Sequence, residues 1–430
     1  MFASRGRRRQ AREWVLWGVP IALVALSGVL VVSTERQADT NLISYLQNGD
    51  LRTFWQRTGF GAMHWLTGVV GLAIALILQR IPLTRLRPLL IPVYGLTVVS
   101  LIAVRLIGTT ALGAQRWISI GGVHVQPSEF AKIAAILLLG AVLSRHPAER
   151  PIDLLRPLGV ISIPWLLVFI QPDLGTSLVF GALLLTMLYW SGMPIEWVVL
   201  LLSPLLTALF SGLLPWAMAA WIPMMAVIAY RSLPWKRLAA FVTLLVHGGM
   251  ALVTPWLWLH GLKDYQRDRL VLFLDPSQDP LGGGYHLLQS TVGIGSGGLF
   301  GTGLLQGQLT KLRFIPEQHT DFIFSALGEE TGFIGCLFVV ICFALLMGRL
   351  LQVARNARSD FEALVVIGIG TMVMFQVVVN IFMTIGLGPV TGIPLPFLSY
   401  GRSAMIVNFI SLGLCLSVVR QSRSLITGRR

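Results

Sequence analysis

The stretch FEALVVIGIGTMVMFQVVVNIFMTI, residues 361–385, contains a single charged residue, Glu362. An α-helix rises about 1.5 Å per residue, so about 20 apolar residues cross the roughly 30 Å hydrocarbon layer of a bilayer. This stretch is therefore long enough and apolar enough to form a membrane-spanning helix. The rest of the chain repeats the same pattern on both sides of it.

Twelve candidate spans can be marked between polar breaks, and two of them, the fifth and eighth, are short and contain or adjoin proline. The chain has 430 residues, of which 55% are apolar and only 12% charged, and its mean hydropathy is +0.74. These values exclude an ordinary soluble protein. The predicted fold class is an all-α polytopic membrane protein with about 10–12 transmembrane helices. The candidate spans are 14–33, 61–79, 88–107, 127–144, 157–171, 175–191, 196–214, 216–230, 238–258, 322–347, 361–385 and 403–419.

The formal net charge of +14 indicates topology rather than a nucleic-acid partner. If the N-terminus is cytoplasmic, 21 of the 33 Lys and Arg residues fall in inner segments, 10 in outer segments and two within spans. Positively charged loops resist translocation, so this bias predicts that both termini are cytoplasmic. We therefore expect a basic tail at 1–13, one transmembrane domain at 14–419 and a second cytoplasmic tail at 420–430. The basic segments would face anionic lipid headgroups, and no nucleic acid is expected.

One connection, residues 259–321, is far longer than a usual loop. It carries acids, histidines and many glycines, together with aromatic and aliphatic side chains that a disordered segment would lack. We expect this large extracytoplasmic loop to pack over the helices or dip into them. Its Gly293-Ile-Gly-Ser-Gly-Gly298 run formally matches a dinucleotide fingerprint but lacks the strand and helix context. The glycines are better explained by turns and close backbone approach.

Ionisable residues within or beside the spans are the sharper signal, because each costs several kcal/mol unless it is paired or hydrated. Glu129 and Lys132 are three residues apart, hence on one helix face, where they could simply neutralise each other. Asp173 stands at a helix start, where capping is the simpler explanation. The full set is Arg105, Glu129, Lys132, Asp173, Glu329 and Glu330.

Two further positions need partners inside the bundle. Glu329 and Glu330 lie about two turns into a predicted span, so at least one of them must find a hydrogen-bond donor there. His247, in the ninth span, is expected to be a hydrogen-bonded interior histidine without a catalytic role.

The long loop adds acids and bases in a mixture that suits chemistry on an anionic, lipid-linked substrate. Carboxylates can serve as general acid or base, and Arg can bind two phosphate oxygens at once. The same composition also fits a solvated charged loop, and composition alone does not choose between them. The residues are Asp275, Asp279, His286, Lys311, Arg313, Glu317, His319 and Asp321.

Seven motifs, in order along the chain, resemble the SEDS family, named for shape, elongation, division and sporulation. They are Arg116-Trp117, QPSEFAK at 126–132, QPDLGTS at 171–177, DPSQDPLGGGYHLLQS at 275–290, GIGSGGL at 293–299, FIPEQHTDFIF at 314–324 and GIPLPFLSYG at 392–401. The resemblance extends from about residue 60 to the C-terminus. The sequence around Tyr285-His286 is more similar to the RodA branch than to the FtsW branch.

The resemblance implies a bacterial inner-membrane peptidoglycan glycosyltransferase that joins lipid II units into glycan chains and releases undecaprenyl pyrophosphate. It also implies a class B penicillin-binding protein as partner, within the elongation complex that sets cell shape. Two departures stand out. Residues 196–258 hold three apparent spans where the family has one, an even excess that keeps Asp279 on the outer side. Arg402 stands where the family has a second glycine.

Asp279 falls on the family's proposed catalytic aspartate and would take the proton of the attacking sugar hydroxyl. Inversion by direct displacement needs one base and a stabilised leaving group rather than a second carboxylate nucleophile. Lys132, Arg116 and Arg313 would offset the pyrophosphate charge, Glu129 would orient Lys132, and Trp117 would offer an amphipathic edge. The other candidate substrate-binding residues are Asp173, Glu317, His319, Asp321 and His286.

Several alternatives remain open on the sequence. A divalent cation at the pyrophosphate is compatible with the chemistry, but no ligand cluster demands one, and three separated cysteines indicate neither a disulfide framework nor a metal finger. A lipid II flippase, an FtsW-like septal polymerase and a non-enzymatic scaffold share the polytopic architecture. The flippase would move lipid II without making chains, and the scaffold would tolerate loss of the Asp279 carboxylate.

Overall fold

The structure, a computed structural model, describes the chain except Met1 and residues 36–58, 112–113, 122, 172, 261–266, 268–270, 274, 276–278, 280–283, 316 and 428–430. Among the basic residues used to orient the chain, Arg36, Arg52, Arg57, Lys263, Arg269, Arg429 and Arg430 lie outside the described residues. The long helices are α1 (Phe2–Glu35), α4 (Gly59–Leu78), α6 (Leu90–Ile107), α7 (Pro127–Arg145), α8 (Leu155–Ile170), α9 (Leu174–Trp190), α10 (Ile195–Leu213), α11 (Met218–Ser232), α12 (Lys236–His260), α16 (Ile323–Arg355), α17 (Asp360–Thr384) and α18 (Arg402–Thr427).

Every one of the twelve predicted spans coincides with one of these helices. In the described part of the chain, ten helices are long and apolar enough to cross a membrane. Two predicted spans fall short of that length: α9 has 17 residues and α11 has 15. The prediction of a helical membrane protein with about 10–12 spans is confirmed. The shorter connecting elements are α5 (Leu83–Leu86), η1 (Arg87–Leu89), η2 (Pro151–Leu154), η3 (Pro215–Ala217), α14 (Tyr285–Ser296) and α15 (Gln308–Lys311).

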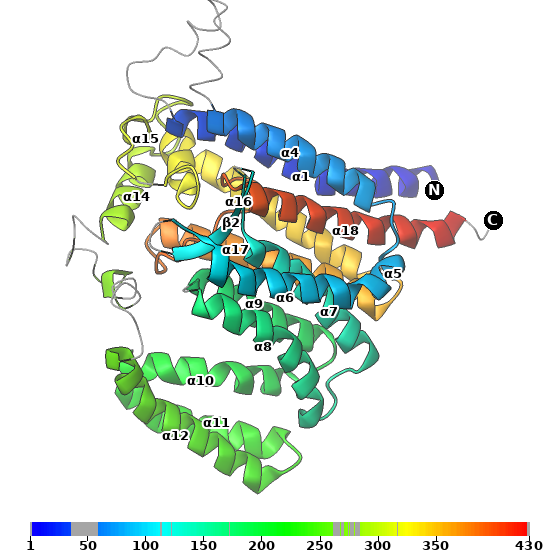
Figure 1. Cartoon of the computed structure of the whole chain (residues 1–430), viewed down its shortest axis with the longest axis vertical. Helices are drawn as coiled ribbons and strands as arrows, with labels where there is room; N and C mark the ends of the chain where they lie inside the picture. The colour runs from blue at the N-terminus through cyan, green and yellow to red at the C-terminus, as the bar shows by residue number, and fades with distance from the viewer. Residues whose placement is uncertain are drawn as a thin grey trace, which may run out of the picture.

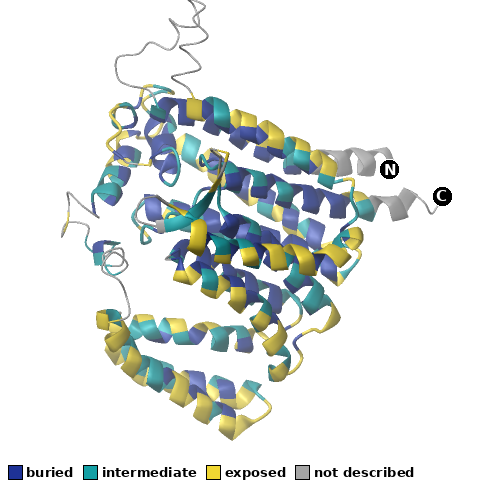
Figure 2. Cartoon of the chain, viewed as in Figure 1, coloured by how far each residue is buried: buried dark blue, intermediate teal, exposed yellow. Residues whose placement is uncertain are grey.

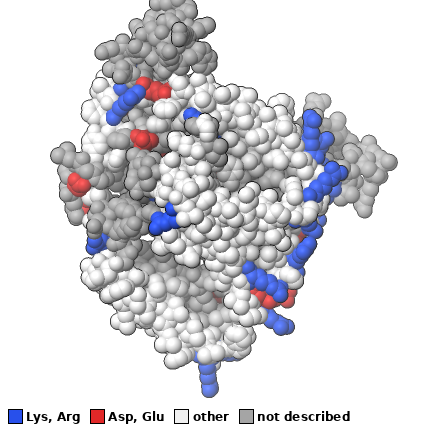
Figure 3. Space-filling model, in the orientation of Figure 1, with Lys and Arg blue, Asp and Glu red and all other residues white. Residues whose placement is uncertain are grey.

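The long helices lie roughly antiparallel to one another, and the two chain termini reach the same end of the bundle (Figure 1). We call this the basic end, because it also bears α5, η2 and most of the Lys and Arg residues visible in Figure 3. The opposite end, here called the loop end, bears α14 and α15 (Figure 1). The charge asymmetry that the sequence predicts is therefore present in three dimensions.

Burial separates the molecule into a dense core and a looser group. The core is built around α7, α9 and α17, with α16 and α18 packed against them. The three-helix unit α10–α12 packs mainly on itself and adjoins the core through α9 (Figure 1). Exposed residues dominate the outer surface of this unit (Figure 2), as expected for apolar helices that face lipid.

A small antiparallel sheet joins α6 to α7 and was not predicted. Its strands are β1 (Thr109–Ala111), β2 (Ala114–Ile120) and β3 (Val123–Val125), in the order β1-β2-β3. Trp117 in β2 is opposite Thr109, and Ile118 is opposite Val125. The sheet supplies hydrogen-bond partners for backbone groups in the connection between α6 and α7. Hydropathy alone had marked this connection only as a polar break between two spans.

Helix α16 breaks at Gly332, whose φ of 65° and ψ of −164° are not helical. The carbonyls of Glu329 and Glu330, freed by the break, accept hydrogen bonds from the amides of Thr302 (2.9 Å) and Gly303 (3.0 Å). A Cβ placed on Gly301 would lie 2.1 Å from the Glu330 carbonyl oxygen. Within the 293–298 motif, a Cβ placed on Gly297 would lie 2.0 Å from the Gly328 carbonyl oxygen. The glycine-rich segment is therefore used for close backbone approach, which confirms that interpretation of the motif.

Candidate active site

Asp279 lies on the connection that leads into α14 at the loop end. Its side chain is exposed, and its main-chain carbonyl accepts a hydrogen bond from the Gly284 amide (3.0 Å). Gly284 is the residue that precedes the first turn of α14. An exposed carboxylate anchored through its own backbone is accessible to a large substrate, which a general base requires.

Glu129 and Lys132 form a buried ion pair in the first turns of α7. The Lys132 ammonium donates to Glu129 Oε1 at 2.6 Å, and the side chains are only 1% and 4% exposed. Pro127 occupies the first helical turn, and the Gln126 amide that precedes it donates to Ser403 Oγ (3.0 Å) on α18. The pair predicted from the spacing is therefore present, and Lys132 is enclosed in protein.

Arg116 and Asp173 form a second pair, which links strand β2 to helix α9. Arg116 Nη1 lies 3.8 Å from Asp173 Oδ1. Asp173 also caps α9, since it accepts hydrogen bonds from the amide (3.1 Å) and hydroxyl (2.9 Å) of Thr176. The capping role predicted for Asp173 is confirmed. The Arg116 side chain is 15% exposed, so it is more accessible than Lys132, and Trp117 beside it is half-buried.

Arg313, Glu317 and His319 lie in a separate group near the start of α4. Arg313 Nη2 donates to the Glu35 carbonyl (2.6 Å), and His319 Nε2 lies 3.9 Å from Glu317 Oε2. The His319 ring stacks on Phe60, with ring centroids 5.2 Å apart and planes 4° apart. Burial lowers the pKa of His319 below its usual value, an effect that Glu317 opposes and Arg313 reinforces.

Arg313 and Glu317 also share an unusual backbone conformation. Their φ values are 52° and 51°, in the left-handed region that side chains with a Cβ rarely adopt. Such residues cost on the order of 1–3 kcal/mol each and persist only where surrounding contacts hold them. Arg313 and Glu317 are therefore constrained positions, and the hydrogen bond from Arg313 to the Glu35 carbonyl helps to fix the first of them.

The remaining predicted residues, His286 and Asp321, are both next to Phe322, the residue that precedes the first turn of α16. His286 stacks on Phe322 with ring centroids 6.0 Å apart. The Asp321 carbonyl accepts a hydrogen bond from Asn380 Nδ2 (2.8 Å), which also donates to the Ile393 carbonyl (2.8 Å). Asn380 thus ties two of the sequence motifs together, and nothing in its local pattern would have identified it.

Glu329 and Glu330 find the partners that their depth in a span requires. Glu329 accepts hydrogen bonds from the amides of Leu309 (2.8 Å) and Thr310 (2.9 Å) and from the Thr310 hydroxyl (2.6 Å). Glu330 accepts from the Leu305 amide (3.0 Å) and from the Ser33 hydroxyl of α1. These two carboxylates hold the 305–310 segment against the core, and they were not among the predicted site residues.

The two groups of candidates are joined by a short segment that leads into α18. The Tyr400 amide donates to the His319 carbonyl (2.9 Å), while the Ser403 hydroxyl, three residues on, accepts from the Gln126 amide. The structure therefore brings Arg116 to Asp173, Glu129 to Lys132 and Glu317 to His319. Within the described residues no three His, Cys, Asp or Glu side chains gather closely enough to hold a metal ion.

Comparison with known proteins identifies relatives along almost the whole chain. The family described as cell cycle protein, FtsW/RodA/SpoVE, matches residues 13–220 and 214–424. The chain is similar to peptidoglycan glycosyltransferase MrdB of Escherichia coli K12, with 35% identity over 371 residues that cover 85% of this chain and 88% of MrdB. Peptidoglycan glycosyltransferase RodA of Treponema pallidum is 36% identical over 348 residues, or 75% of this chain and 80% of that protein.

A solved structure has the same arrangement of helices. It is the structure of a peptidoglycan synthase complex that coordinates polymerization and crosslinking. The matching chain is 28% identical, superposes with a TM-score of 0.65, and the match covers 95% of the present chain and 98% of the other. The likeness therefore extends over the loop end as well as the helical core.

Proposed function

The chain belongs to the FtsW/RodA/SpoVE family of cell cycle proteins, and from this membership we infer that it is a peptidoglycan glycosyltransferase with a RodA-type role in cell elongation and cell shape. The observation that carries the inference is the match with MrdB, which covers 85% of this chain and 88% of MrdB. The helical architecture shared with the synthase complex supports it.

We propose that the substrate is lipid II and that Asp279 is the general base. The 4-hydroxyl of one lipid-linked sugar attacks the anomeric carbon of another, the bond to pyrophosphate breaks with inversion, and the hydroxyl proton passes to Asp279. The exposure of Asp279 at the loop end supports access for two bulky substrates. The family resemblance of the 275–290 motif supports its assignment as the base.

The leaving pyrophosphate needs positive charge, and two arginines and a lysine are candidates. Arg116 has the more accessible guanidinium and can form two parallel hydrogen bonds to phosphate oxygens. Lys132 is enclosed and already paired with Glu129, so it would reach the substrate only when that pair opens. We therefore assign first contact with the pyrophosphate to Arg116, and orientation of the site to the Glu129–Lys132 pair.

We also propose a class B penicillin-binding protein as partner, within the elongation complex. The resemblance to a peptidoglycan synthase complex that couples polymerization to crosslinking supports a crosslinking partner. The protein would lie in the bacterial inner membrane with the basic end in the cytoplasm, since most of the Lys and Arg residues visible in Figure 3 gather there. The loop end would then face the compartment where the wall is built.

The catalytic assignment is tested by polymerisation of labelled lipid II with the purified full-length protein and its crosslinking partner. Asp279→Asn removes the base and should lower the rate by about 10²–10⁴-fold. Asp275→Asn, in the same motif, is the matched control and should retain activity with an unchanged melting temperature. Full activity of folded Asp279→Ala would overturn the assignment. A protein that only moved lipid II between leaflets would make no glycan chains in this assay.

The orientation is tested with single cysteines introduced at two positions of the three-helix unit, in a background that lacks the native cysteines. Ser211 lies near the end of α10 at the loop end, and Arg231 near the end of α11 at the basic end. We expect a membrane-impermeant thiol reagent added outside to label Ser211→Cys but not Arg231→Cys. The reverse pattern would invert the proposed topology.

A further inference from the structure

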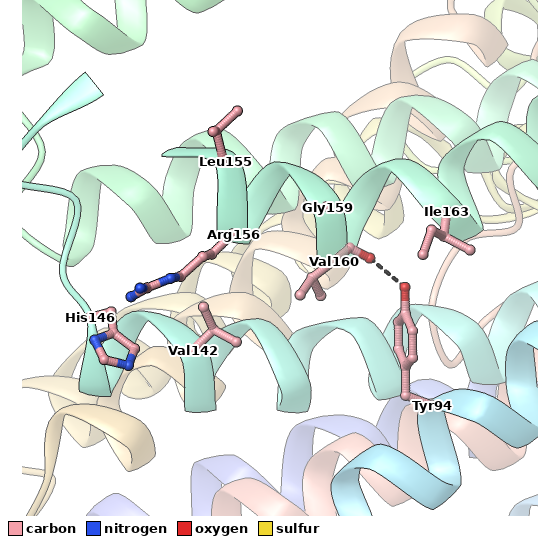
Figure 4. Close-up of a pocket in the computed structure, with 8 residues that line it drawn as sticks. All are labelled: Tyr94, Val142, His146, Leu155, Arg156, Gly159, Val160 and Ile163. Carbon is pink, nitrogen blue, oxygen red and sulfur yellow. Dashed lines mark hydrogen bonds between the residues drawn. The ribbon is translucent and has the colours of Figure 1, made fainter. Parts of the chain in front are cut away.

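A groove opens between α7 and α8 near the basic end, and Tyr94 of α6 closes one end of it (Figure 4). Its volume is about 640 Å³, and its lining combines aliphatic side chains with two basic ones. Figure 4 shows the Arg156 guanidinium and the His146 imidazole side by side at one end, and Tyr94 at the other. The proposed active site uses none of these residues.

The groove is a fixed feature of the fold because a proline shapes its wall. Pro164 lies inside α8 and has no N–H, so the Val160 carbonyl loses its usual helical donor. Tyr94 of α6 supplies the missing donor, with its hydroxyl 2.7 Å from that carbonyl. This bond holds α6 and α8 together at the inner end of the groove. A backbone group that would otherwise be unsatisfied in the membrane is thereby satisfied.

The opposite end of the groove carries unneutralised positive charge. Arg156 is exposed in the first turn of α8, and His146 is exposed at the end of α7. No ion pair joins Arg156 to any carboxylate of the described chain. Nearby Asp153 accepts a hydrogen bond from the Arg150 amide within its own turn. The cationic mouth is therefore open to an external anion.

The polarity of the groove matches an amphipathic ligand. Its basic mouth lies at the helix ends, at the level of lipid headgroups, while Val142, Val160 and the exposed Ile163 line the part that runs into the apolar span. Gly159 leaves the groove open, because nothing lies within 4 Å of a Cβ placed there. Basic pockets between transmembrane helices at the cytoplasmic side suit anionic lipid headgroups.

We propose that this groove binds an anionic glycerophospholipid of the leaflet at the basic end, with its phosphate on Arg156 and His146 and an acyl chain along Val160 and Ile163. This assignment rests on the proposed orientation in the membrane but not on the catalytic reaction. It therefore stands or fails separately from the polymerase function.

Native mass spectrometry of the full-length protein in detergent tests the proposal, with phosphatidylglycerol and phosphatidylcholine of identical acyl chains as probes. We expect the unmodified protein to prefer phosphatidylglycerol, and Arg156→Gln to weaken that binding about fivefold, the effect of one basic residue near a lipid headgroup. Arg231→Gln, at the same end but outside the groove, is the matched control and should bind like the unmodified protein. Equal losses in the two variants would overturn the site.

A second variant tests the apolar half of the groove. Gly159→Leu places a side chain in the groove, where an added Cβ would meet nothing within 4 Å. It should reduce binding of both lipids while the melting temperature stays unchanged or rises, since leucine favours a helix more than glycine does. Unaltered lipid binding in Gly159→Leu would refute the proposal. Competition by millimolar inorganic phosphate alone would indicate a small-anion site, and preference for a polyprenyl phosphate would indicate a different lipid class; either result would overturn the assignment.

Discussion

The core helices and the three-helix unit α10–α12 handle polar groups in opposite ways. In the core, 72% of the residues in the span of α7 are buried, against 17% in the spans of α10 and α12. The core holds charges at depth, namely Glu129 with Lys132 and the carboxylates Glu329 and Glu330. The buried polar groups of the three-helix unit are neutral hydroxyls and a histidine, namely Ser203, Thr207, Thr243 and His247.

The difference teaches where this fold can accommodate charge. A buried ion costs several kcal/mol unless hydrogen bonds or a counter-ion compensate. Glu129 and Lys132 compensate each other within α7, whereas the two buried carboxylates of α16 depend on other elements. Glu329 is compensated by a segment 20 residues away in sequence, and Glu330 by α1. His247 needs only the Ser203 hydroxyl (2.9 Å) and the Thr243 carbonyl (2.8 Å), both within its own unit.

The largest effect is expected from breaking the pair in α7. Lys132→Ala leaves Glu129 charged and enclosed, which should lower the free energy of unfolding by about 3–5 kcal/mol. A large drop in melting temperature in a fixed detergent is the readout. The double variant Glu129→Gln/Lys132→Met removes both charges and should recover most of the loss. If the double variant is no better than Lys132→Ala, the pair does not act as a unit.

The same single variant separates binding from chemistry. Lipid II affinity and polymerisation rate should be measured on Lys132→Ala that remains folded at low temperature. Because Lys132 is enclosed and paired, we expect both to fall together. Lost rate with unchanged affinity would instead place the lysine at the chemical step.

A smaller effect is expected from Glu329→Ala. It removes three hydrogen bonds to Leu309 and Thr310, and it should cost about 3 kcal/mol because bonds to a charged group are worth roughly 1.5–3 kcal/mol each and water partly replaces them. The protection of the 305–310 amides against hydrogen exchange should fall first. Glu149→Gln, on an exposed carboxylate at the basic end, is the control and should leave both measurements unchanged. If the 305–310 amides kept their normal protection in Glu329→Ala, Glu329 would not be what holds this segment against the core.

The smallest effect is expected in the three-helix unit. His247→Leu should cost about 1 kcal/mol, since the Ser203 hydroxyl still donates to the Leu200 carbonyl (2.8 Å) and is not left unsatisfied. The polymerisation rate of lipid II should not change. A loss of stability as large as that of Lys132→Ala would show that losing a buried polar group costs the same in both regions. The contrast between the core and the three-helix unit would then be wrong.

Much of the helical scaffold could be predicted because hydropathy is local. The candidate spans 361–385 and 127–144 agree with α17 and α7 to within one residue at each end. The prediction failed to separate 322–347 into two helical pieces, since the break at Gly332 depends on the segment 298–303 packing against it. The predicted span 216–230 is shifted by two residues from α11 (Met218–Ser232), and both are 15 residues long, too few to cross a bilayer unaided.

In the candidate site, too, contacts within one helical turn could be predicted and contacts between distant segments could not. The i,i+3 spacing of Glu129 and Lys132 and the helix-start position of Asp173 were sufficient to predict the pair and the cap, because both partners lie within one turn. The contacts of Arg116 with Asp173, of Asn380 with the Asp321 and Ile393 carbonyls, and of Glu329 with Thr310 join residues far apart in the chain.

The sequence by itself determined that this protein is a membrane-embedded helical bundle with a biased distribution of basic residues, because hydrophobicity and charge add up residue by residue along the chain. Only the tertiary structure decided which buried charge meets which partner and where α16 breaks. It also decided that the Tyr94 hydroxyl donates to the Val160 carbonyl, which Pro164 leaves without a helical donor. Those outcomes depend on distances between segments remote in sequence, which no local pattern encodes.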